Sequence, residues 1–223
     1  MNEDFSKLLS PFQFPVSGIQ VDNRIVMAPM TTFSGNEDGT VSDDELSYYK
    51  ERNRGAGLLI SACAYVTPQG KAFPGQFSAY SDDMLPSLKR LAAALKENGG
   101  KAVLQIHHGG RMCPPELVPG GEPLSASAVA PVREGAVTPR EMTELEIEET
   151  IAAYGEAARR AVEAGFDGVE IHGANTYLIQ QFFSPHSNRR TDKWRGSLEK
   201  RMTFPLAVVD AVKAAVKKAS DRP

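Results

Sequence analysis

The chain has 223 residues, of which 41% are hydrophobic, and we expect residues 1–223 to form a single domain with a substantial core. Its net charge of -3, from 25 basic and 28 acidic residues spread without long runs, argues against nucleic acid or an anionic membrane as partner and favours a small molecule. Cys63 and Cys113 form neither a disulfide framework nor a zinc pattern, and no apolar run approaches the roughly 18 residues of a membrane span, so we expect a cytoplasmic protein without a metal site.

Four apolar, strand-like runs alternate with helix-like segments. The runs are residues 25–28, 58–62, 102–106 and 168–171. This alternation is typical of parallel βαβ units, in which each helix returns the chain to the start of the next strand. The sequence therefore predicts an α/β protein with a parallel sheet.

Local signals mark where the helices begin and end. Ser42 with Glu45, and Thr143 with Glu146, predict two capping boxes, and the acidic residues after Ser81 predict another helix start. A glycine stands between a helix and the next strand at three places, where a left-handed residue can end the helix: Gly55, Gly99 and Gly165. These signals divide the chain into the same units as the strand-like runs.

The last helix and a long connection complete the predicted order. Apolar residues at spacings of three and four predict one buried stripe on the last helix: Leu198, Met202, Pro205, Val209, Val212 and Val216. Between the third strand and the third helix, residues 111–142 form an excursion rich in Pro and Gly without a convincing period. Because this is long for a plain connection, we expect the excursion to shape a site.

Parallel βα units can close into a barrel or lie open as a doubly wound sheet. A dinucleotide-binding sheet should carry G-x-G-x-x-G after its first strand, but this chain has MAPMT there, from Met27 to Thr31. A barrel instead requires polar residues at the carboxyl ends of several strands, and Thr31, Gln105, His108 and His172 meet that requirement. We therefore predict a TIM (β/α)8-type barrel, with about the first four βα units present in this chain.

Polar residues cluster where the fourth strand ends. Side chains alternate along a strand, so Glu170 and His172 share one face, which in a barrel looks into the centre. His172, Asn175 and Tyr177 would then gather at the barrel mouth. Two nitrogen donors could hold an oxygen that gains negative charge, while the phenol could donate a proton.

Other interpretations of this cluster stay open. A histidine at a strand end can simply bond a loop while a tyrosine packs, and Glu170 with His172 could serve as the acid and base of a barrel lyase or isomerase. Strand alternation also places His107, rather than His108, on the same face as Gln105.

Three segments in chain order carry a resemblance that goes beyond single motifs. They are NRIVMAPMTTFS at 23–34, QIHHGGR at 105–111, and the stretch 164–204 that holds the polar cluster. Together they resemble the Old Yellow Enzyme family of FMN-dependent oxidoreductases, over residues 11–204 of this chain. The resemblance implies an FMN-binding barrel domain, and the family's fifth-strand arginine and later glycine-rich phosphate loop have no counterpart in the chain.

The resemblance implies a role for each matching residue. Tyr177 would donate a proton, and His172 and Asn175 would anchor the activating oxygen of the substrate. Gln105 would bond the pyrimidine edge of the flavin, a role that suits an amide with donor and acceptor ends. The residues expected at FMN are Ala28, Pro29, Met30, Thr31, Cys63, Gln105 and His172, with Cys63 interpreted as a buried thiol without a redox role.

The implied reaction has two halves. NADPH or NADH reduces FMN, and hydride then passes to an activated alkene, such as an enone or a nitroalkene, or to a quinone, while Tyr177 protonates the alkene carbon. Two alternatives stay open: an inactive half-barrel, present as a fragment or as a subunit completed by another copy or chain, and the dienoyl-thioester reductase branch of the same family.

Overall fold

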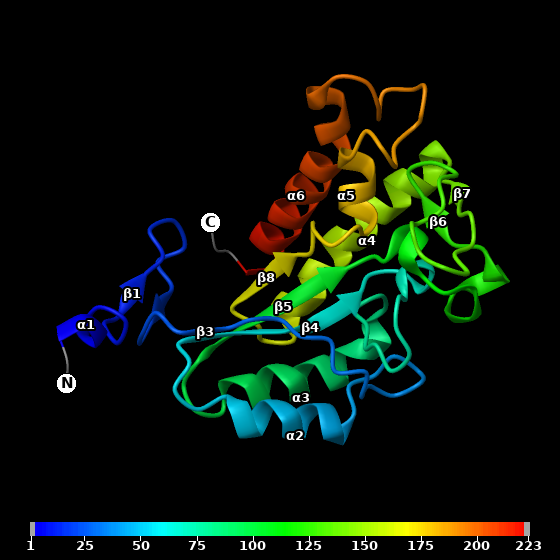
Figure 1. The fold of residues 1–223 in the computed structure, drawn as a ribbon. Helices are drawn as coiled ribbons and strands as arrows, with labels where there is room; N and C mark the ends of the chain where they lie inside the picture. Colours follow the sequence, from blue (N-terminus) through cyan, green and yellow to red (C-terminus); the bar gives the residue numbers. More distant parts are fainter. Residues whose placement is uncertain (1–2, 221–223) are drawn as a thin grey trace.

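The computed structural model describes residues 3–220 and shows a central parallel sheet flanked by helices (Figure 1). The strands are β1 (Phe12–Gln13), β2 (Gln20–Val21), β3 (Val26–Met27), β4 (Leu58–Tyr65), β5 (Lys101–His107), β6 (Leu124–Ser125), β7 (Arg140–Glu141) and β8 (Gly168–Ile171). The helices are α1 (Glu3–Ser6), α2 (Asp43–Arg52), α3 (Leu85–Lys96), α4 (Glu144–Glu163), α5 (Leu178–Phe183) and α6 (Leu198–Ser220). Within the described range, none of these helices is long and apolar enough to cross a bilayer.

The central sheet has the order β3-β4-β5-β8, and all its pairs are parallel. These are the four strands predicted from the sequence, although β3 is shorter than expected and β4 continues to Tyr65. β4 shifts its register against β5 between Ile60 and Cys63, which is the mark of a bulge. The expected partial α/β barrel is therefore confirmed.

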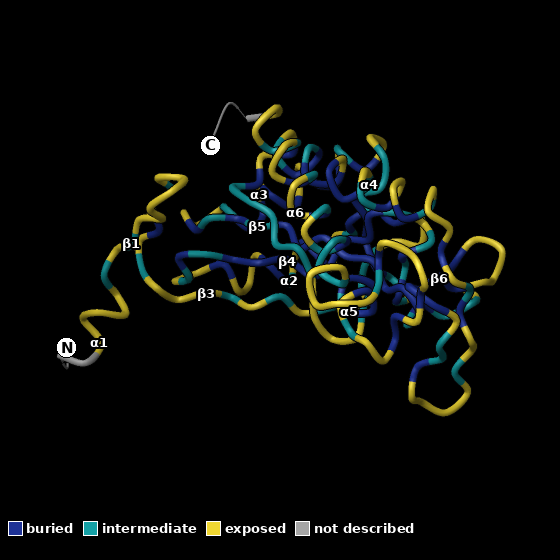
Figure 2. Tube along the Cα trace, turned by 90° about the horizontal axis from the view of Figure 1, so that it is seen from above, coloured by how far each residue is buried: buried dark blue, intermediate teal, exposed yellow. Residues whose placement is uncertain are grey.

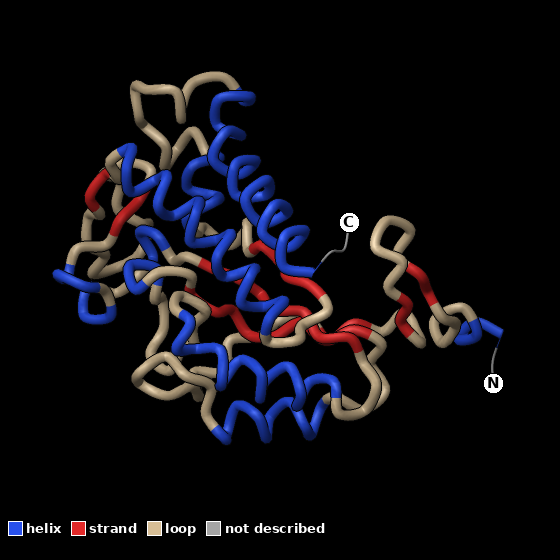
Figure 3. The backbone as a smooth tube through the Cα atoms, turned by 180° about the vertical axis from the view of Figure 1, so that it is seen from behind, coloured by secondary structure: helices blue, strands red, loops and turns tan. Residues whose placement is uncertain are grey.

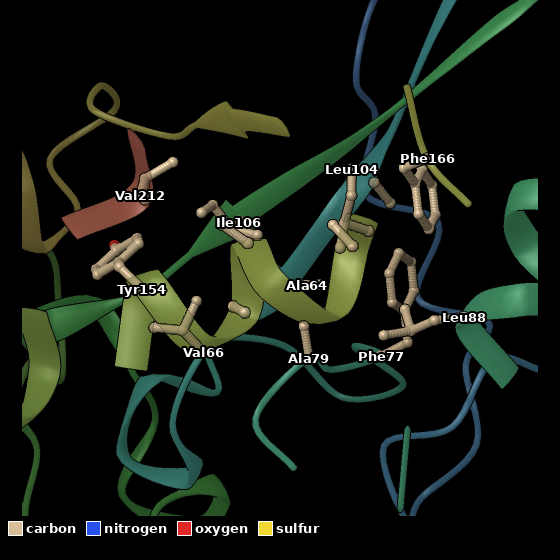
Figure 4. Packing of buried hydrophobic residues seen from close by; sticks show 14 of the residues in the cluster. Ala64, Val66, Phe77, Ala79, Leu88, Leu104, Ile106, Tyr154, Phe166 and Val212 are labelled. Carbon is tan, nitrogen blue, oxygen red and sulfur yellow. The ribbon is translucent and has the colours of Figure 1, made fainter. Parts of the chain in front are cut away.

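Helices flank the sheet in two pairs. α2 lies beside α3 and α4 lies beside α6, with the strands between the pairs (Figure 3). Leu104 and Ile106 of β5 are fully buried in one cluster with Leu88 of α3 and Tyr154 of α4 (Figure 4). Because burying one aliphatic side chain of this size stabilises a protein by about 2 kcal/mol, the cluster holds β5 firmly at the centre of the sheet.

Most predicted helix ends are confirmed. Thr143 and Glu146 form the reciprocal capping box of α4. The three glycines between helices and strands have left-handed φ values of 86°, 92° and 91° at Gly55, Gly99 and Gly165. Each glycine therefore ends its unit where an L-residue with a Cβ would be strained.

The capping box predicted at Ser42 is wrong in one half. Ser42 Oγ accepts a hydrogen bond from the Glu45 N–H at 3.0 Å, as expected for an N-cap. The Glu45 carboxylate, however, is buried and accepts hydrogen bonds from the hydroxyls of Thr32 and Ser34. It thereby ties α2 to the segment that follows β3, instead of closing the helix end.

The buried stripe of α6 also differs from the predicted one. Phe204, Val208 and Val212 are buried, whereas Val209 is 37% exposed. α6 packs against both α4 and α5, and Phe204 stacks on Phe182 of α5 with ring centroids 4.1 Å apart. α4 and α5, the second of which the sequence pattern did not predict, together cover this face of α6.

Two further regions carry structure without a clear sequence signal. Before β3 the chain forms the antiparallel pair β1 and β2, which projects from the body of the molecule and is largely exposed (Figure 2). The excursion at 111–142 holds 3-10 turns and the short parallel pair β6 and β7. Each strand of these pairs is two residues long, which is too short for a periodic sequence pattern to predict it.

Candidate active site at the carboxyl ends of the strands

A cavity of about 460 Å³ opens at the carboxyl ends of the strands of the central sheet. Its lining residues are Pro29, Thr31, Cys63, Gln105, Glu170, Ile171, His172, Gly173, Ala174, Asn175 and Tyr177. A larger cavity, of about 690 Å³, lies at the amino end of β8 beside α4 and α6, and its lining includes no His, Tyr or Cys. We place the candidate site in the smaller cavity because hydrogen-bonding and titratable groups converge there.

The polar cluster lies on the turn that follows β8. The His172 N–H donates to the Ile106 carbonyl at 3.0 Å, so this residue leaves the sheet at a fixed point. Asn175 and Thr176 then adopt left-handed φ values of 56° and 66°. This strained reversal brings the Tyr177 ring back to within 4.9 Å of the His172 ring, measured between centroids.

Two glutamines of α5 hold this turn. The Thr176 N–H donates to Gln180 Oε1, and Gln181 Nε2 donates to the Thr176 carbonyl at 2.6 Å and to the Gly109 carbonyl at 3.2 Å. Gln181 is buried, and its Oε1 accepts from the Arg111 N–H at 3.1 Å. These bonds satisfy backbone groups that the strained turn would otherwise leave unpaired. The sequence pattern indicates neither residue as part of the site, because it predicts no helix at 178–183.

The structure brings most of the predicted site residues together. His172, Asn175 and Tyr177 line one cavity, and His172 is joined there by four more of the expected cofactor residues: Pro29, Thr31, Cys63 and Gln105. Ala28 and Met30 do not line it; both are exposed, Met30 by 63%. The alternation of exposed and half-buried residues along 28–31 shows that every second side chain turns away from the cavity.

The two rings of the cluster are uncharged at neutral pH. Burial lowers the pKa of His172, and the nearby Glu170 carboxylate opposes this shift. Burial also raises the pKa of Tyr177. The cavity therefore presents a neutral imidazole and a protonated phenol, which keeps a proton that it can donate.

His107 lies directly behind these rings. It is fully buried, and its ring centroid is 4.3 Å from that of Tyr177 and 5.3 Å from that of His172. Burial holds the pKa of His107 well below its usual range, so the imidazole is neutral. The prediction that His107 shares the inner face with Gln105 fits this position, but no sequence pattern indicates its contact with Gln76 at 3.2 Å.

Cys63 lies in the wall of the cavity. Its Sγ is 3.7 Å from the Thr31 hydroxyl, and the backbone carbonyl of Cys63 accepts from Gln76 Nε2 at 3.0 Å. Burial raises the pKa of the Cys63 thiol to about 11. The Cys63 thiol is therefore protonated and forms a small part of the cavity wall, in line with its interpretation as a buried thiol.

Gln105 and Glu170 face each other across β5 and β8. They are direct partners in the strand register, and Gln105 Nε2 donates to Glu170 Oε1 at 2.7 Å. Within the described residues, no Lys or Arg lines the cavity. Glu170 thus lines the cavity with its carboxylate held by the Gln105 amide.

The sequence matches known proteins over nearly its whole length. A family model described as the NADH:flavin oxidoreductase / NADH oxidase family matches residues 7–220. A probable NADH-dependent flavin oxidoreductase of Bacillus subtilis is 55% identical over 215 residues, which cover 96% of this chain and 57% of that protein. The NADH:acrylate oxidoreductase of Vibrio harveyi is 55% identical over 197 residues, which cover 88% of this chain and 20% of that protein.

A solved structure shows the same arrangement. The old yellow enzyme homologue from Zymomonas mobilis superimposes with a TM-score of 0.87 at 32% identity, over 96% of this chain and 61% of that chain. The described chain therefore spans little more than half the length of the Bacillus subtilis relative and of this structure.

Proposed function

The chain belongs to the NADH:flavin oxidoreductase / NADH oxidase family, and on that premise we propose that it binds FMN and directs hydride from NADH to an activated alkene. The observation that carries the proposal is the cavity where His172, Asn175 and Tyr177 meet Gln105 and Thr31. Bound FMN would supply the hydride chemistry. The residues of the chain would supply binding, orientation and the proton.

The lining residues fit the ring system of FMN. A flavin presents both hydrogen-bond donors and acceptors along its pyrimidine edge, and the Gln105 amide can meet both kinds. The Thr31 hydroxyl faces the same cavity and has only the long contact to the Cys63 thiol, at 3.7 Å, so it can donate to a ligand. Because the lining residues in the described part of the chain include no Lys or Arg, the fit is to the uncharged ring and not to the phosphate.

His172 and Asn175 would hold the activating oxygen of the substrate. The Ala174 N–H donates to His172 Nδ1 at 3.4 Å, so Nδ1 is the acceptor and the neutral ring carries its proton on Nε2. Asn175 adds an amide donor from the same turn. A carbonyl or nitro oxygen gains negative charge when hydride reaches the conjugated alkene, and two donors would stabilise that charge.

Tyr177 would protonate the second alkene carbon. The phenol lines the cavity beside His172, and its raised pKa keeps the proton in place until carbon takes it. Its position is fixed because Gln181 and Gln180 hold the preceding residue, Thr176.

The names of the relatives support the choice of reductant and substrate class. Both relatives at 55% identity carry NADH in their names, which favours NADH over NADPH. Acrylate, named for the Vibrio harveyi protein, is an alkene conjugated to a carboxylate and belongs to the proposed substrate class.

The proposal is tested with purified protein supplied with FMN. We expect bound yellow flavin and saturable oxidation of NADH with 2-cyclohexenone or with a quinone. Tyr177→Phe should lower alkene reduction by about 100-fold, the size of a general-acid contribution, and leave quinone reduction intact because no carbon is protonated. Tyr48→Phe on α2, away from the cavity, is the matched control.

Two outcomes would count against this proposal. A protein that stays colourless and oxidises no NADH would favour the alternative of a non-catalytic part of a larger assembly. Equal loss of alkene and quinone reduction in Tyr177→Phe would remove the proposed proton transfer.

A further inference from the structure

Ser125 belongs to the excursion at 111–142, which the proposed reaction leaves without a role. It lies in β6 and is fully buried, and β6 packs against α5. The Ser125 hydroxyl donates to Gln181 Oε1 at 3.0 Å, across 56 positions of the chain. One buried hydrogen bond therefore joins the excursion to the helix that begins directly after Tyr177.

The side-chain amide of Gln181 is fully used by its partners. Its Oε1 accepts from the Ser125 hydroxyl and from the Arg111 N–H at 3.1 Å. Its Nε2 donates to the Thr176 carbonyl at 2.6 Å and to the Gly109 carbonyl at 3.2 Å. A backbone N–H can only donate and a carbonyl can only accept, so the amide has one orientation. Because each of its N–H groups and lone pairs has a partner, turning the side chain cannot replace a partner that is lost.

The backbone beside this amide leaves room for it. Gly110 has a left-handed φ of 59°, and a Cβ at this position would overlap Gln181 Oε1. Glycine is therefore required here both by the backbone angle and by the space. The second glycine of the QIHHGGR segment is thus explained by the close approach of the Gln181 amide.

The bond to Thr176 links this arrangement to the proton donor. The Thr176 carbonyl belongs to the peptide group that leads into Tyr177, and Thr176 has a left-handed φ of 66°. Such a conformation persists only where the surrounding structure holds it. The peptide group between Asn175 and Thr176 is held separately, since the Thr176 N–H donates to Gln180. A loosened Gln181 should therefore displace the Tyr177 phenol more than the Asn175 amide.

We propose that Ser125 is a positioning residue for the proposed proton transfer and acts on Tyr177 through Gln181. The inference rests on the proposed function, since it concerns the same proton donor. It gives the excursion a part in the chemistry, although Ser125 does not line the cavity. Proton transfer to carbon depends on the distance and direction of the phenol, whereas quinone reduction protonates no carbon. The two reactions should therefore respond differently to a change at Ser125.

The test compares Ser125→Ala with Ser127→Ala in the full chain. Ser127 is the matched control because it is also buried in the excursion but makes its hydrogen bonds with Ala126 and Arg189. The first readout is the ratio of the rates of NADH oxidation with 2-cyclohexenone and with a quinone, in protein loaded with FMN. The second readout needs no FMN: it is the hydrogen exchange of the backbone amides at 174–178, measured by mass spectrometry.

We expect Ser125→Ala to lower the ratio of alkene to quinone reduction about tenfold, because a slightly misplaced phenol transfers its proton more slowly. Exchange at 174–178 should become faster in this variant, whereas Ser127→Ala should keep the wild-type values of both readouts.

A wild-type ratio in Ser125→Ala, or a parallel loss of both reactions, would overturn the inference and leave the proposed function intact. A wild-type protein that reduces no alkene would instead contradict the proposed function. In that case the exchange measurement would still decide whether Ser125 holds the turn, and wild-type exchange in Ser125→Ala would show that it does not.

Discussion

Gln76 donates a side-chain N–H to Nδ1 of His107 across 3.2 Å, and this bond decides which nitrogen of the imidazole carries the proton. The direction of the Gln76 amide is itself fixed, because its Oε1 accepts from the Ala72 N–H at 2.8 Å. Nε2 of Gln76 must therefore face His107 and the Cys63 carbonyl. The neutral His107 ring then carries its proton on its own Nε2. This single tautomer lies against the Tyr177 ring.

Replacing Gln76 by leucine should strongly destabilise the fold. The change leaves the Ala72 N–H and the Cys63 carbonyl without partners in a buried place, at about 1–3 kcal/mol for each orphaned group. We expect the free energy of unfolding in urea to fall by about 2–4 kcal/mol. Gln13→Leu is the control, because Gln13 makes one exposed bond to Gly18 and should change stability little. Equal effects of the two changes would contradict the importance of this network.

The free energy of unfolding should decrease as the pH is lowered, because His108 is buried in its neutral form. Burial lowers the pKa of His108 from 6.5 to about 3. Between these values the unfolded chain binds a proton that the folded chain does not, so the free energy of unfolding falls as pH drops from 6.5 toward 3, by about 1.4 kcal/mol per pH unit at most.

His108→Asn tests this dependence. Asparagine keeps an acceptor for the Gly110 N–H, which donates to His108 Nδ1 at 3.0 Å, but it takes up no proton. The free energy of unfolding in urea, measured between pH 7 and pH 4, should depend less steeply on pH in this variant, by the equivalent of about one proton. His186→Asn, which removes an exposed histidine instead of the buried one, is the matched control. If the stability of His108→Asn depended on pH as steeply as that of the wild type, His108 would not be the cause of the loss of stability in acid.

Asn175 should tolerate glycine better than a β-branched residue. Its φ of 56° strains any side chain with a branched Cβ, and Asn175→Val should lower the free energy of unfolding by about 1–2 kcal/mol. Asn175→Gly should keep the stability of the wild type. Both variants lose the amide, so both should show a higher KM for the enone, and only the valine variant should also unfold more easily. A stable Asn175→Val variant would contradict the strain at this turn.

Both cysteines should be inert toward thiol reagents in the folded protein. Cys63 and Cys113 are buried, and burial raises their pKa values to about 11 and about 12. At pH 8 we expect no thiol–disulfide exchange with dithiobis(nitrobenzoate), which would release its coloured thiolate, until urea exposes the two thiols. Ser17→Cys, at an exposed position, serves as a positive control that reacts at once. Rapid reaction of the native protein would mean that the cavity wall opens in solution.

The structural features predicted correctly from the sequence are those determined by residues close together in the chain. β8 has the predicted bounds, and the capping box of Thr143 with Glu146 depends on residues one helical turn apart. The convergence of His172, Asn175 and Tyr177 follows from one turn and from the common direction of parallel strands.

The parts that it missed depend on partners far along the chain. Glu45 looks like half of a local cap, but hydroxyls more than ten residues earlier hold its carboxylate. Gln76 and Gln181 carry no recognisable motif, and only the folded structure shows that they hold His107 and Thr176. The face that α6 buries depends on its packing against α4 and α5, and no sequence pattern predicted α5.

The left-handed pair at Asn175 and Thr176 also limits how this protein can be redesigned. Since backbone angles hold the amide in place, few amino acids are acceptable at these two positions, and randomising them would yield mostly unstable variants. Ile171 and Ala174 contribute to the same wall from ordinary backbone conformations. A library intended to broaden substrate choice should therefore vary those two positions and leave the strained pair untouched.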